Sequence, residues 1–353
     1  MNAEQIELEA QFGREPWRDG QPVKIVHLTN STGMRLSLMD VGATWLSCVV
    51  PVAGEGREVL LRAQNLQAHQ EQTAYLGAVV GRYANRIYLG QFQLNDKTYQ
   101  TTINNRKNSL HGGVNGFDKR RWQIESQTSQ SVCFSLISDD GDQGYPGRLI
   151  VKVAYQLTDD HQVQIKYWAQ GDQDCPVNLT NHAYFNLAAK PSKHIFDHQL
   201  QLDAQHYLPV TQELIPTGEW RKVRGSSFDF EIAKKIGQDF LTDSQQEITQ
   251  GYDHAFILNP EKTDGLSDIA TLIAPDKSLC MRVKTTKPSI QVYTGNFLSG
   301  IAGYDGVYQA NAGIALETQY VPDGPNQTNF AYGYVLLEAH KTYQHSTCYQ
   351  FQF

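Results

Sequence analysis

The chain has 353 residues and a formal net charge of −7 at pH 7. Nucleic acids and anionic membranes are bound by concentrated fields of lysine and arginine, so this acidic balance argues against both as partners. The five cysteines are scattered and form no CxxC pair, which argues against a disulfide framework or a thiolate zinc site and predicts a reducing cytoplasm. No apolar run approaches the roughly 20 residues of a membrane span, and the N-terminus lacks the basic and apolar regions of a signal peptide. We therefore expect neither export nor a membrane anchor.

Strand-like patterning dominates the chain. Apolar and polar residues alternate with a period of two in "LIVKVAYQL", and shorter runs repeat the pattern. Gly, Asn, Asp and Pro separate these runs, as in the tight turn predicted at "DDGDQGYPG". In chain order the sequence predicts a helix within the first dozen residues, strands at 23–28, 34–41, 132–137, 149–157 and 163–167, a helical stretch around Ile232, Ile236 and Phe240, and strands at 279–284, 290–295 and 348–353.

These elements predict an all-β fold, mostly antiparallel, in the form of a large sandwich or barrel with few short helices. The length fits one large β domain or two smaller ones. No linker, low-complexity tract or internal repeat divides the chain, which favours one. We expect residues 1–353 to form a single domain, with residues 1–21 as an N-terminal extension packed on or beside it.

The first candidate for chemistry is His111, in "NSLHGGVNG". Gly112 and Gly113, which follow it, permit backbone angles closed to other residues and let a ligand approach closely. A histidine on such a loop can donate a hydrogen bond to a polar ligand. The alternative is a turn histidine that hydrogen-bonds the backbone.

The second candidate is His182, in "CPVNLTNHAYFNL", where asparagines alternate with apolar residues. Amides and an imidazole in an apolar frame suit the binding of hydroxyl groups, and Tyr184 and Phe185 are available to stack on a sugar face. The alternative is a strand edge with turns capped by asparagine.

The third candidate is Glu317, which follows the apolar residues of "GIAL". Burial raises the pKa of a carboxylate toward the range in which it acts as a general base near neutrality. The alternative is an outward-facing glutamate on a strand.

Further polar residues could supply binding contacts. "GRYANRI" carries Arg82, Asn85 and Arg86, whose forked donors suit hydroxyl groups, although a structural ion pair is an equal alternative for one of the arginines. Asp253 stands at the start of a strand in "GYDHAFIL", and Gln291 faces opposite to its apolar neighbours in "SIQVYTG". An acidic acceptor and an amide are common partners of sugar hydroxyls.

The motifs of several other enzyme classes are missing from the sequence. It contains no nucleophile elbow, Walker loop, dinucleotide fingerprint or HExxH motif. His194 and His198 are four residues apart, but no helix is predicted there to align them on a metal. We therefore expect neither a metal nor a nucleotide cofactor.

Seven segments together closely resemble the aldose 1-epimerases, also called galactose mutarotases. The resemblance runs from about Pro22 to the C-terminus and implies a β-supersandwich fold, in agreement with the all-β pattern. After Asn326 the chain departs from the family, because it lacks the usual proline-containing segment and "PG" turn. The segments are, in order, "GRYANRI", "NSLHGGVNGFDKRRW", "DDGDQGYPG", "NLTNHAYFNL", "GYDHAF", "QVYTGNF" and "ALETQYVPDGPN".

The resemblance also implies residue roles. The glutamate of the "LE" motif, here Glu317, is the general base, and the histidine of the "NH" motif, here His182, is the general acid. The histidine of "LHGG", here His111, binds and polarises the sugar. The reaction implied is interconversion of the α and β anomers of aldohexoses such as galactose and glucose by ring opening, without metal or nucleotide. The family's sugar contacts fall on Asn85, Arg86, Asp253 and Gln291.

Two alternatives would use the same scaffold. A non-catalytic sugar-binding module would not need both His182 and Glu317. An epimerase for phosphorylated hexoses would need several cations converging on the phosphate, and the one tight basic run, Lys119–Arg121, is more simply a solvated loop. The expected partner is a monosaccharide, and the sequence indicates neither the oligomeric state nor the preferred aldose.

Overall fold

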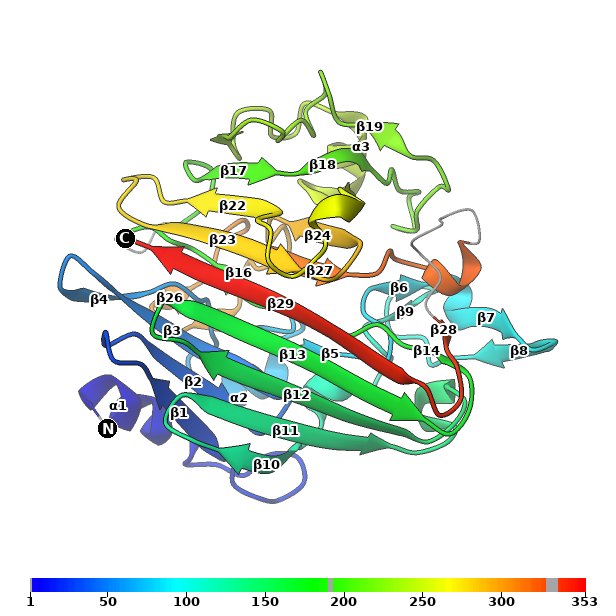
Figure 1. Ribbon diagram of the computed structural model, residues 1–353, viewed down its shortest axis with the longest axis horizontal. Coiled ribbons are helices and arrows are strands. Elements are labelled where there is room, and N and C mark those ends of the chain that lie inside the picture. The colour runs from blue at the N-terminus through cyan, green and yellow to red at the C-terminus, as the bar shows by residue number, and fades with distance from the viewer. Residues whose placement is uncertain (1, 190–192, 328–335) are drawn as a thin grey trace.

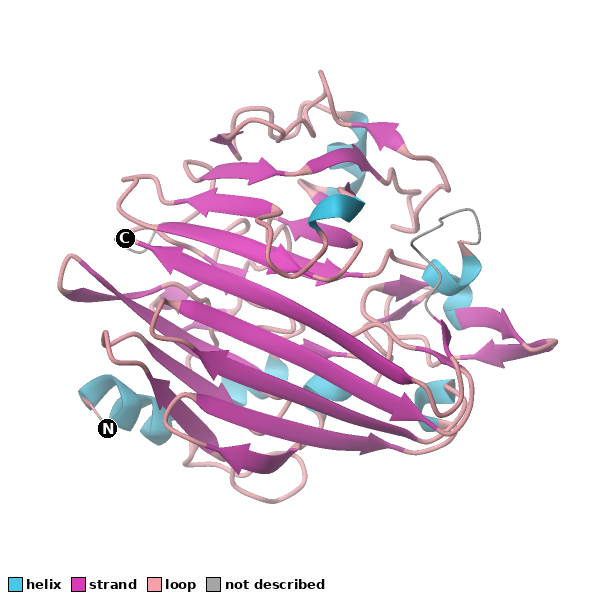
Figure 2. Ribbon diagram, in the orientation of Figure 1, coloured by secondary structure: helices cyan, strands magenta, loops and turns pink. Residues whose placement is uncertain are grey.

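The computed structural model describes residues 2–189, 193–327 and 336–353. Strands are its main regular structure, joined by many loops, and the helices are short (Figure 2). Within the described ranges the α-helices are α1 (Ala3–Phe12), α2 (Leu66–Glu71) and α3 (Ser244–Thr249), and the 3₁₀ turns are η1 (Tyr88–Gly90), η2 (Phe117–Lys119), η3 (Asp142–Gly144), η4 (Pro260–Lys262) and η5 (Gly324–Asn326). None of the helices in this part of the chain is long and apolar enough to cross a membrane.

A nine-stranded antiparallel sheet forms one layer of the molecule, and its long strands run side by side across Figure 1. Its strands alternate between buried and more exposed residues, as in β12, because one face covers the core. In spatial order the strands are β10 (Gln123–Gln127), β11 (Ser131–Ser138), β12 (Leu149–Leu157), β13 (Gln162–Gly171), β29 (Thr342–Gln352), β23 (Cys280–Thr285), β22 (Ala270–Ile273), β17 (Gln199–Leu202) and β20 (Lys234–Lys235).

Two further antiparallel sheets form the opposing layer. The six-stranded sheet has the order β16 (Tyr184–Phe185), β27 (Ile314–Gln319), β24 (Ser289–Tyr293), β21 (Asp253–Leu258), β18 (Ala204–Tyr207) and β19 (Arg221–Lys222). The four-stranded sheet has the order β1 (Ile25–Thr29), β2 (Arg35–Met39), β3 (Thr44–Val52) and β4 (Glu55–Glu58). Short two-stranded ladders pair β5 (Val79–Val80) with β15 (Thr180–Asn181), β6 (Arg86–Ile87) with β9 (Ser109–Leu110), β7 (Gln91–Leu94) with β8 (Lys97–Gln100), β14 (Cys175–Pro176) with β28 (Leu336–Leu337), and β25 (Ala302–Gly303) with β26 (Gly306–Val307).

The core lies between these layers, and Trp45 joins all three sheets. From β3 its fully buried ring contacts Phe185 of β16 at 5.9 Å and Tyr349 of β29 at 5.7 Å between ring centroids. Tyr349 in turn donates a hydrogen bond to the carbonyl oxygen of Leu316 in β27, at 3.1 Å. The fold is therefore a sandwich of large sheets with aromatic residues at its centre, as the alternating pattern predicts.

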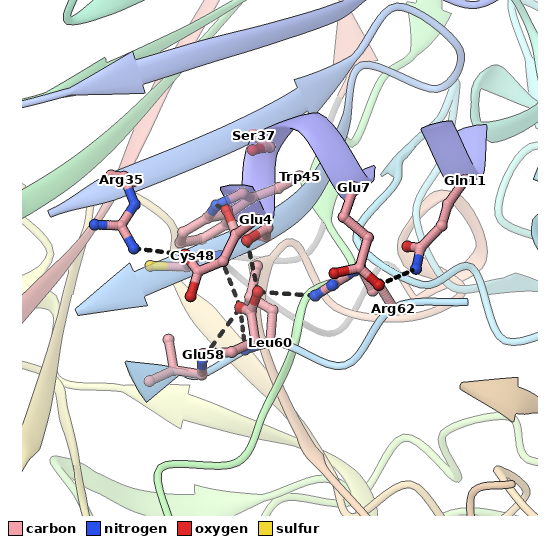
Figure 3. Close-up of polar contacts among 12 residues, drawn as sticks. Glu4, Glu7, Gln11, Arg35, Ser37, Trp45, Cys48, Glu58, Leu60 and Arg62 are labelled. Carbon is pink, nitrogen blue, oxygen red and sulfur yellow. Dashed lines mark hydrogen bonds and ion pairs between the residues drawn. The ribbon is translucent and has the colours of Figure 1, made fainter. Parts of the chain in front are cut away.

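The N-terminal residues pack against the four-stranded sheet. Leu8 and Phe12 of α1, and Trp17 after it, form a buried cluster with Met39 and Val41. The helix begins at a capping box in which Asn2 and Gln5 hydrogen-bond each other's backbone. Glu4 of this helix pairs with Arg35 of β2 at 2.6 Å. Figure 3 shows this pair and the pair of Glu58 with Arg62.

The long alternating runs form the strands that the sequence predicts, but the helix predicted around Ile232, Ile236 and Phe240 is wrong. The backbone N–H groups of Ile236 and Gly237 donate to residues 198 and 196, not to the preceding turn, and 234–235 form β20 beside β17. Pairing with a distant strand therefore overrides the local period. The departure from the family pattern predicted after Asn326 falls partly on residues 328–335, which lie outside the described residues.

Candidate active site

A polar cavity of about 470 Å³ opens beside the six-stranded sheet. Its walls come from several parts of the chain: the loops around residues 72–75 and 104–119, strand β6, the segment at 182–184, strands β21, β24 and β27, and the loops at residues 214 and 297. Of the seven predicted site residues, the six that line this cavity are Asn85, Arg86, His111, His182, Asp253 and Glu317. The fold thus brings together residues that the sequence scatters over more than 230 positions.

Three neighbouring strands carry the acidic and amide residues of the site. Gln291 of β24 lies directly opposite Glu317 of β27, and Asp253 of β21 lies opposite Tyr293 of β24. Cross-strand partners present their side chains on the same face, so all of these point to the cavity side of the sheet. The amide of Gln291 donates to the Oδ1 atom of Asp253 at 2.7 Å. Gln291 therefore reaches the site through Asp253.

Glu317 is 2% exposed, and its Oε1 atom lies 3.5 Å from the Nε2 atom of His182. Burial raises the pKa of Glu317 well above its usual range, the negative charge of Asp253 raises it further, and the positive charge of Arg86 opposes both. Glu317 is thus buried, as the sequence predicts, and is not the outward-facing glutamate of the alternative.

His182 follows β15 and is fixed by its backbone. Its N–H donates to the carbonyl oxygen of Ala78 at 2.8 Å, and its own carbonyl accepts from Gly77 at 3.0 Å. Burial lowers the pKa of His182 to about 4. Because burial favours the neutral forms of both partners, the His182–Glu317 pair holds one proton in common near neutral pH. The two side chains are 3.5 Å apart, so either one can carry the shared proton, as acid/base catalysis requires.

His111 is held by two contacts with Asn85. The backbone N–H of Asn85 donates to Nδ1 of His111 at 3.1 Å, and the backbone N–H of His111 donates to the carbonyl oxygen of Asn85, also at 3.1 Å. A neutral imidazole that accepts at Nδ1 carries its proton on Nε2, so this nitrogen is a donor. Burial lowers the pKa of His111 well below its usual value, which keeps the ring neutral.

At Gly112, the glycine after His111, the close approach is to the backbone of Gly81, whereas the sequence predicts the close approach of a ligand. A Cβ atom on Gly112 would lie 1.8 Å from the carbonyl oxygen of Gly81, and the backbone there has a φ of +89°. No residue with a side chain fits that space, so Gly112 fixes the loop that carries His111 against "GRYANRI".

The two arginines of "GRYANRI" have different roles. Arg82 is fully buried away from the cavity, and its guanidinium donates to the carbonyl oxygens of Ser138, Asp139 and Pro146 at 2.7–2.9 Å. Arg86 lines the cavity, with its Nε atom 3.2 Å from Oδ1 of Asn105. Arg82 thus has a structural role, but its partners are carbonyl groups and not the acidic side chain of the predicted ion pair.

The asparagines around His182 do not form the predicted hydroxyl-binding surface. The side chains of Asn178 and Asn181 are buried and donate to main-chain carbonyl groups, Asn181 to Gly77 at 2.6 Å. Tyr184 lines the cavity as expected, whereas Phe185 belongs to the core. The turn-capping alternative therefore describes these amides better.

Sequence reasoning missed several lining residues. Tyr75 contacts His111, with 4.5 Å between ring centroids, and Tyr293, Asn104 and Phe297 are among the other lining residues. Tyr75 lies in the loop just before "GRYANRI", and a lone tyrosine in a loop carries no periodic signal. Tyr293 could have been found, because it is two residues after Gln291 and shares its face of the strand.

The cavity also contains a group that a metal could approach. Candidate ligand atoms of His111, His182 and Glu317 all lie within 4.8 Å of one another. A metal needs a lone pair from each ligand, however, and the contact with Asn85 places a proton on Nε2 of His111. The arrangement therefore fits a hydrogen-bond donor beside an acid/base pair better than a three-ligand metal centre.

Comparison with known proteins identifies the family. The family model for aldose 1-epimerase matches residues 24–350. The chain is 44% identical to the aldose 1-epimerase of Escherichia coli over 94% of this chain and 96% of that protein, and 40% identical to human galactose mutarotase over 97% of each.

Among solved structures, an aldose epimerase homologue from C. elegans superimposes with a TM-score of 0.85 at 28% identity, covering 94% of this chain and 99% of that one. The galactose 1-epimerase from Lactobacillus acidophilus gives 0.83 at 28% identity, covering 95% and 96%. The chain belongs to the aldose 1-epimerase family.

Proposed function

We propose that this protein is an isomerase that interconverts the α and β anomers of aldohexoses such as galactose and glucose. The observation that carries the proposal is the buried His182–Glu317 pair, 3.5 Å apart, beside a neutral histidine donor in a polar cavity. The names of the relatives support the same reaction class.

Ring opening needs a base at one sugar oxygen and an acid at the other. Glu317 takes the proton of the C1 hydroxyl while His182 gives a proton to the ring oxygen, and the bond between C1 and that oxygen breaks. The aldehyde turns about the C1–C2 bond, and the two transfers then run in reverse to close the ring on the other face. The pair keeps the same total number of protons throughout, so the reaction needs no exchange with solvent.

The shared proton must be on His182, and Glu317 must be ionised, when the ring opens. Burial favours the opposite distribution in the free protein. Arg86 opposes the effect of burial on Glu317, and a sugar hydroxyl that donates to the carboxylate has the same effect. Substrate binding thus promotes the reactive distribution of the proton.

The remaining cavity residues hold the sugar. The Nε2–H group of His111 donates to a sugar oxygen and stabilises the negative charge that develops on it. Arg86 and Asn85 donate to hydroxyl groups, and Asp253, oriented by Gln291, accepts from them.

The two alternatives are less well supported. Of the basic run Lys119–Arg121, Lys119 lines the cavity, whereas Arg120 pairs with Asp142 and Arg121 pairs with Asp19 and Asp40. The two arginines of the run are therefore engaged elsewhere, and the run offers a sugar phosphate one cation where several converging cations are expected. A non-catalytic module would not require a buried acid/base pair, which is costly to desolvate.

Two further predictions remain part of the proposal. We propose that residues 1–353 act as one domain, supported by the packing of Leu8, Phe12 and Trp17 on the four-stranded sheet. We also propose a cytoplasmic location, supported by the five cysteines, all of which are free thiols.

Polarimetry tests the reaction. Freshly dissolved α-D-galactose and α-D-glucose are followed with wild-type protein, with Glu317→Gln and with His182→Asn, against the spontaneous rate in buffer. We expect wild-type protein to accelerate the change in rotation and each variant to lose about 100-fold or more of that acceleration. Both variants, purified in parallel, control for any host epimerase carried through purification.

Wild-type decay no faster than buffer would exclude the epimerase. If the wild type is active and Glu317→Gln keeps full turnover, the enzyme stands but the assignment of the base is wrong.

A further inference from the structure

Two tyrosine rings lie nearly parallel to the imidazole of His182. The ring of Tyr184 is 4.9 Å away between centroids with 28° between planes, and the ring of Tyr75 is 5.9 Å away with 19° between planes. Both tyrosines line the polar cavity. The same imidazole therefore has two aromatic faces near it, one from each of two separate chain segments.

The two rings are placed by different means. Tyr184 begins β16 and lies two residues after His182, so the short link between β15 and β16 sets the distance between the two rings. Tyr75 lies in the loop after α2 with a left-handed backbone, φ +58°. Tyr75 also contacts the edge of His111. Neither phenol acts as an acid near neutral pH, because burial raises the pKa of both hydroxyl groups.

The other ionisable groups around His182 do not supply a second stabilising charge. Glu317 on β27 faces it at 3.5 Å, and His111 lies 5.3 Å away between ring centroids. Tyr293 on β24 presents its ring at 6.3 Å, and Asp253 and Arg86 lie in the same cavity. His182 must be an imidazolium before the ring opens, while Glu317 is ionised, and burial disfavours that form. A neighbouring group that attracts a cation would therefore help to populate it.

The face of an aromatic ring attracts a cation within about 6 Å of its centroid, most strongly where water is excluded. We propose that Tyr75 and Tyr184 are positioning residues that hold His182 in its reactive orientation and stabilise its protonated form through their ring faces. The inference rests on the proposed role of His182 as the general acid. It assigns the effect to the rings and not to the phenol hydroxyl groups.

The test separates ring from hydroxyl. Tyr75→Phe and Tyr184→Phe remove the hydroxyl group and keep the aromatic ring. Tyr75→Leu and Tyr184→Leu remove the ring, and they reduce the side-chain volume less than alanine variants would. Tyr304→Leu is the matched control, since Tyr304 is a half-buried tyrosine outside the cavity whose ring lies over Arg62. For each protein, kcat and KM for α-D-galactose are measured by polarimetry across pH, and the pKa of His182 is measured by ¹⁵N NMR.

We expect each phenylalanine variant to keep kcat within about threefold, and each leucine variant to lose about tenfold in kcat with little change in KM. The leucine variants should also show a lower pKa for His182 and an acidic limb of the activity profile moved to lower pH. Tyr304→Leu should match wild type in all three measurements.

The proposal is overturned if the leucine variants keep the wild-type pKa of His182, or if the phenylalanine variants lose as much as the leucine variants. Should a leucine variant fail to fold, Tyr75→Met and Tyr184→Met provide the same comparison with a more flexible side chain. The NMR measurement needs no turnover, so it tests the ring effect even if polarimetry shows that the proposed reaction is wrong.

Discussion

Asn85 and His111 hold each other through two hydrogen bonds of 3.1 Å, one in each direction between their segments. The bond from the Asn85 N–H to Nδ1 decides which nitrogen of His111 carries the proton. This backbone contact therefore turns a histidine into a fixed donor.

That contact predicts a ranking of His111 variants. Glutamine places an amide N–H near the position of Nε2, whereas asparagine places one near Nδ1, where the backbone N–H of Asn85 already points. We expect His111→Gln to retain measurably more kcat than His111→Asn, with asparagine losing roughly 100-fold. Polarimetric kcat values for the two variants check this, and equal losses would show that the fixed tautomer does not matter.

The charges beside Glu317 predict opposite movements of the alkaline limb. Asp253 raises the pKa of Glu317 and Arg86 lowers it. Activity is lost at high pH when the His182–Glu317 pair gives up its shared proton, so the limb follows this pKa. Asp253→Asn should move the alkaline limb of kcat/KM to lower pH, and Arg86→Gln should move it to higher pH. Movement of both variants in the same direction would contradict the assignment.

The acidic limb follows His182. Burial lowers the pKa of His182 to about 4, so the pair should take up its second, inactivating proton only near that pH. We expect kcat/KM to stay nearly constant from pH 7 down to about pH 5. An acidic limb centred near 6.5, the value of an exposed histidine, would show that His182 is not buried in solution.

A buried histidine beneath the N-terminal segment predicts acid sensitivity of the fold. His69 of α2 packs between Phe12 and Trp17, and burial lowers its pKa to about 4. Below pH 6.5 the unfolded chain binds a proton there that the folded chain does not, so stability is lost as pH falls from 6.5 toward 4. At pH 5 this amounts to about 2 kcal/mol. His69→Leu should therefore show a smaller fall in Tm between pH 7.5 and pH 5 than wild type, and an identical fall would contradict the prediction.

The two arginines of "GRYANRI" predict a separation of stability from activity. Arg82→Lys leaves buried carbonyl groups without their donors, so we expect a loss of about 3 kcal/mol in the free energy of unfolding. The folded fraction should keep most of its kcat. Arg86→Lys should show the reverse, with little change in denaturant midpoint and at least a tenfold loss in kcat/KM. Chemical denaturation and polarimetry on both variants make the comparison.

The sequence predicts the long strands well because local period and burial agree there. The run at 149–157 has the same bounds as β12. The prediction from the sequence fails around Ile236, because the backbone there pairs with residues 196–198 and does not follow the helical period of the side chains. Two-residue strands such as β15 and β16 carry too few residues to show any period at all.

The sequence singles out six of the residues that line the cavity, but it does not single out most of the others. His182, Glu317 and Arg86 stand out as polar groups in apolar or glycine-rich contexts. Whether a neighbouring polar residue faces the cavity depends on which main-chain groups need partners. Asn181 is satisfied by the Gly77 carbonyl and Arg82 by three others, and neither contact is visible before the chain is folded.

The alignment of β24 with β27 has a consequence for how this catalyst can change. Glu317 faces the cavity, whereas its neighbour Leu316 faces the core. Inserting or deleting one residue at the start of β27 would exchange the two faces, placing a leucine in the cavity and a carboxylate in the core. Such a change would leave the residues opposite it intact and still remove the base. We therefore expect variation in length to be confined to the loops that connect these strands.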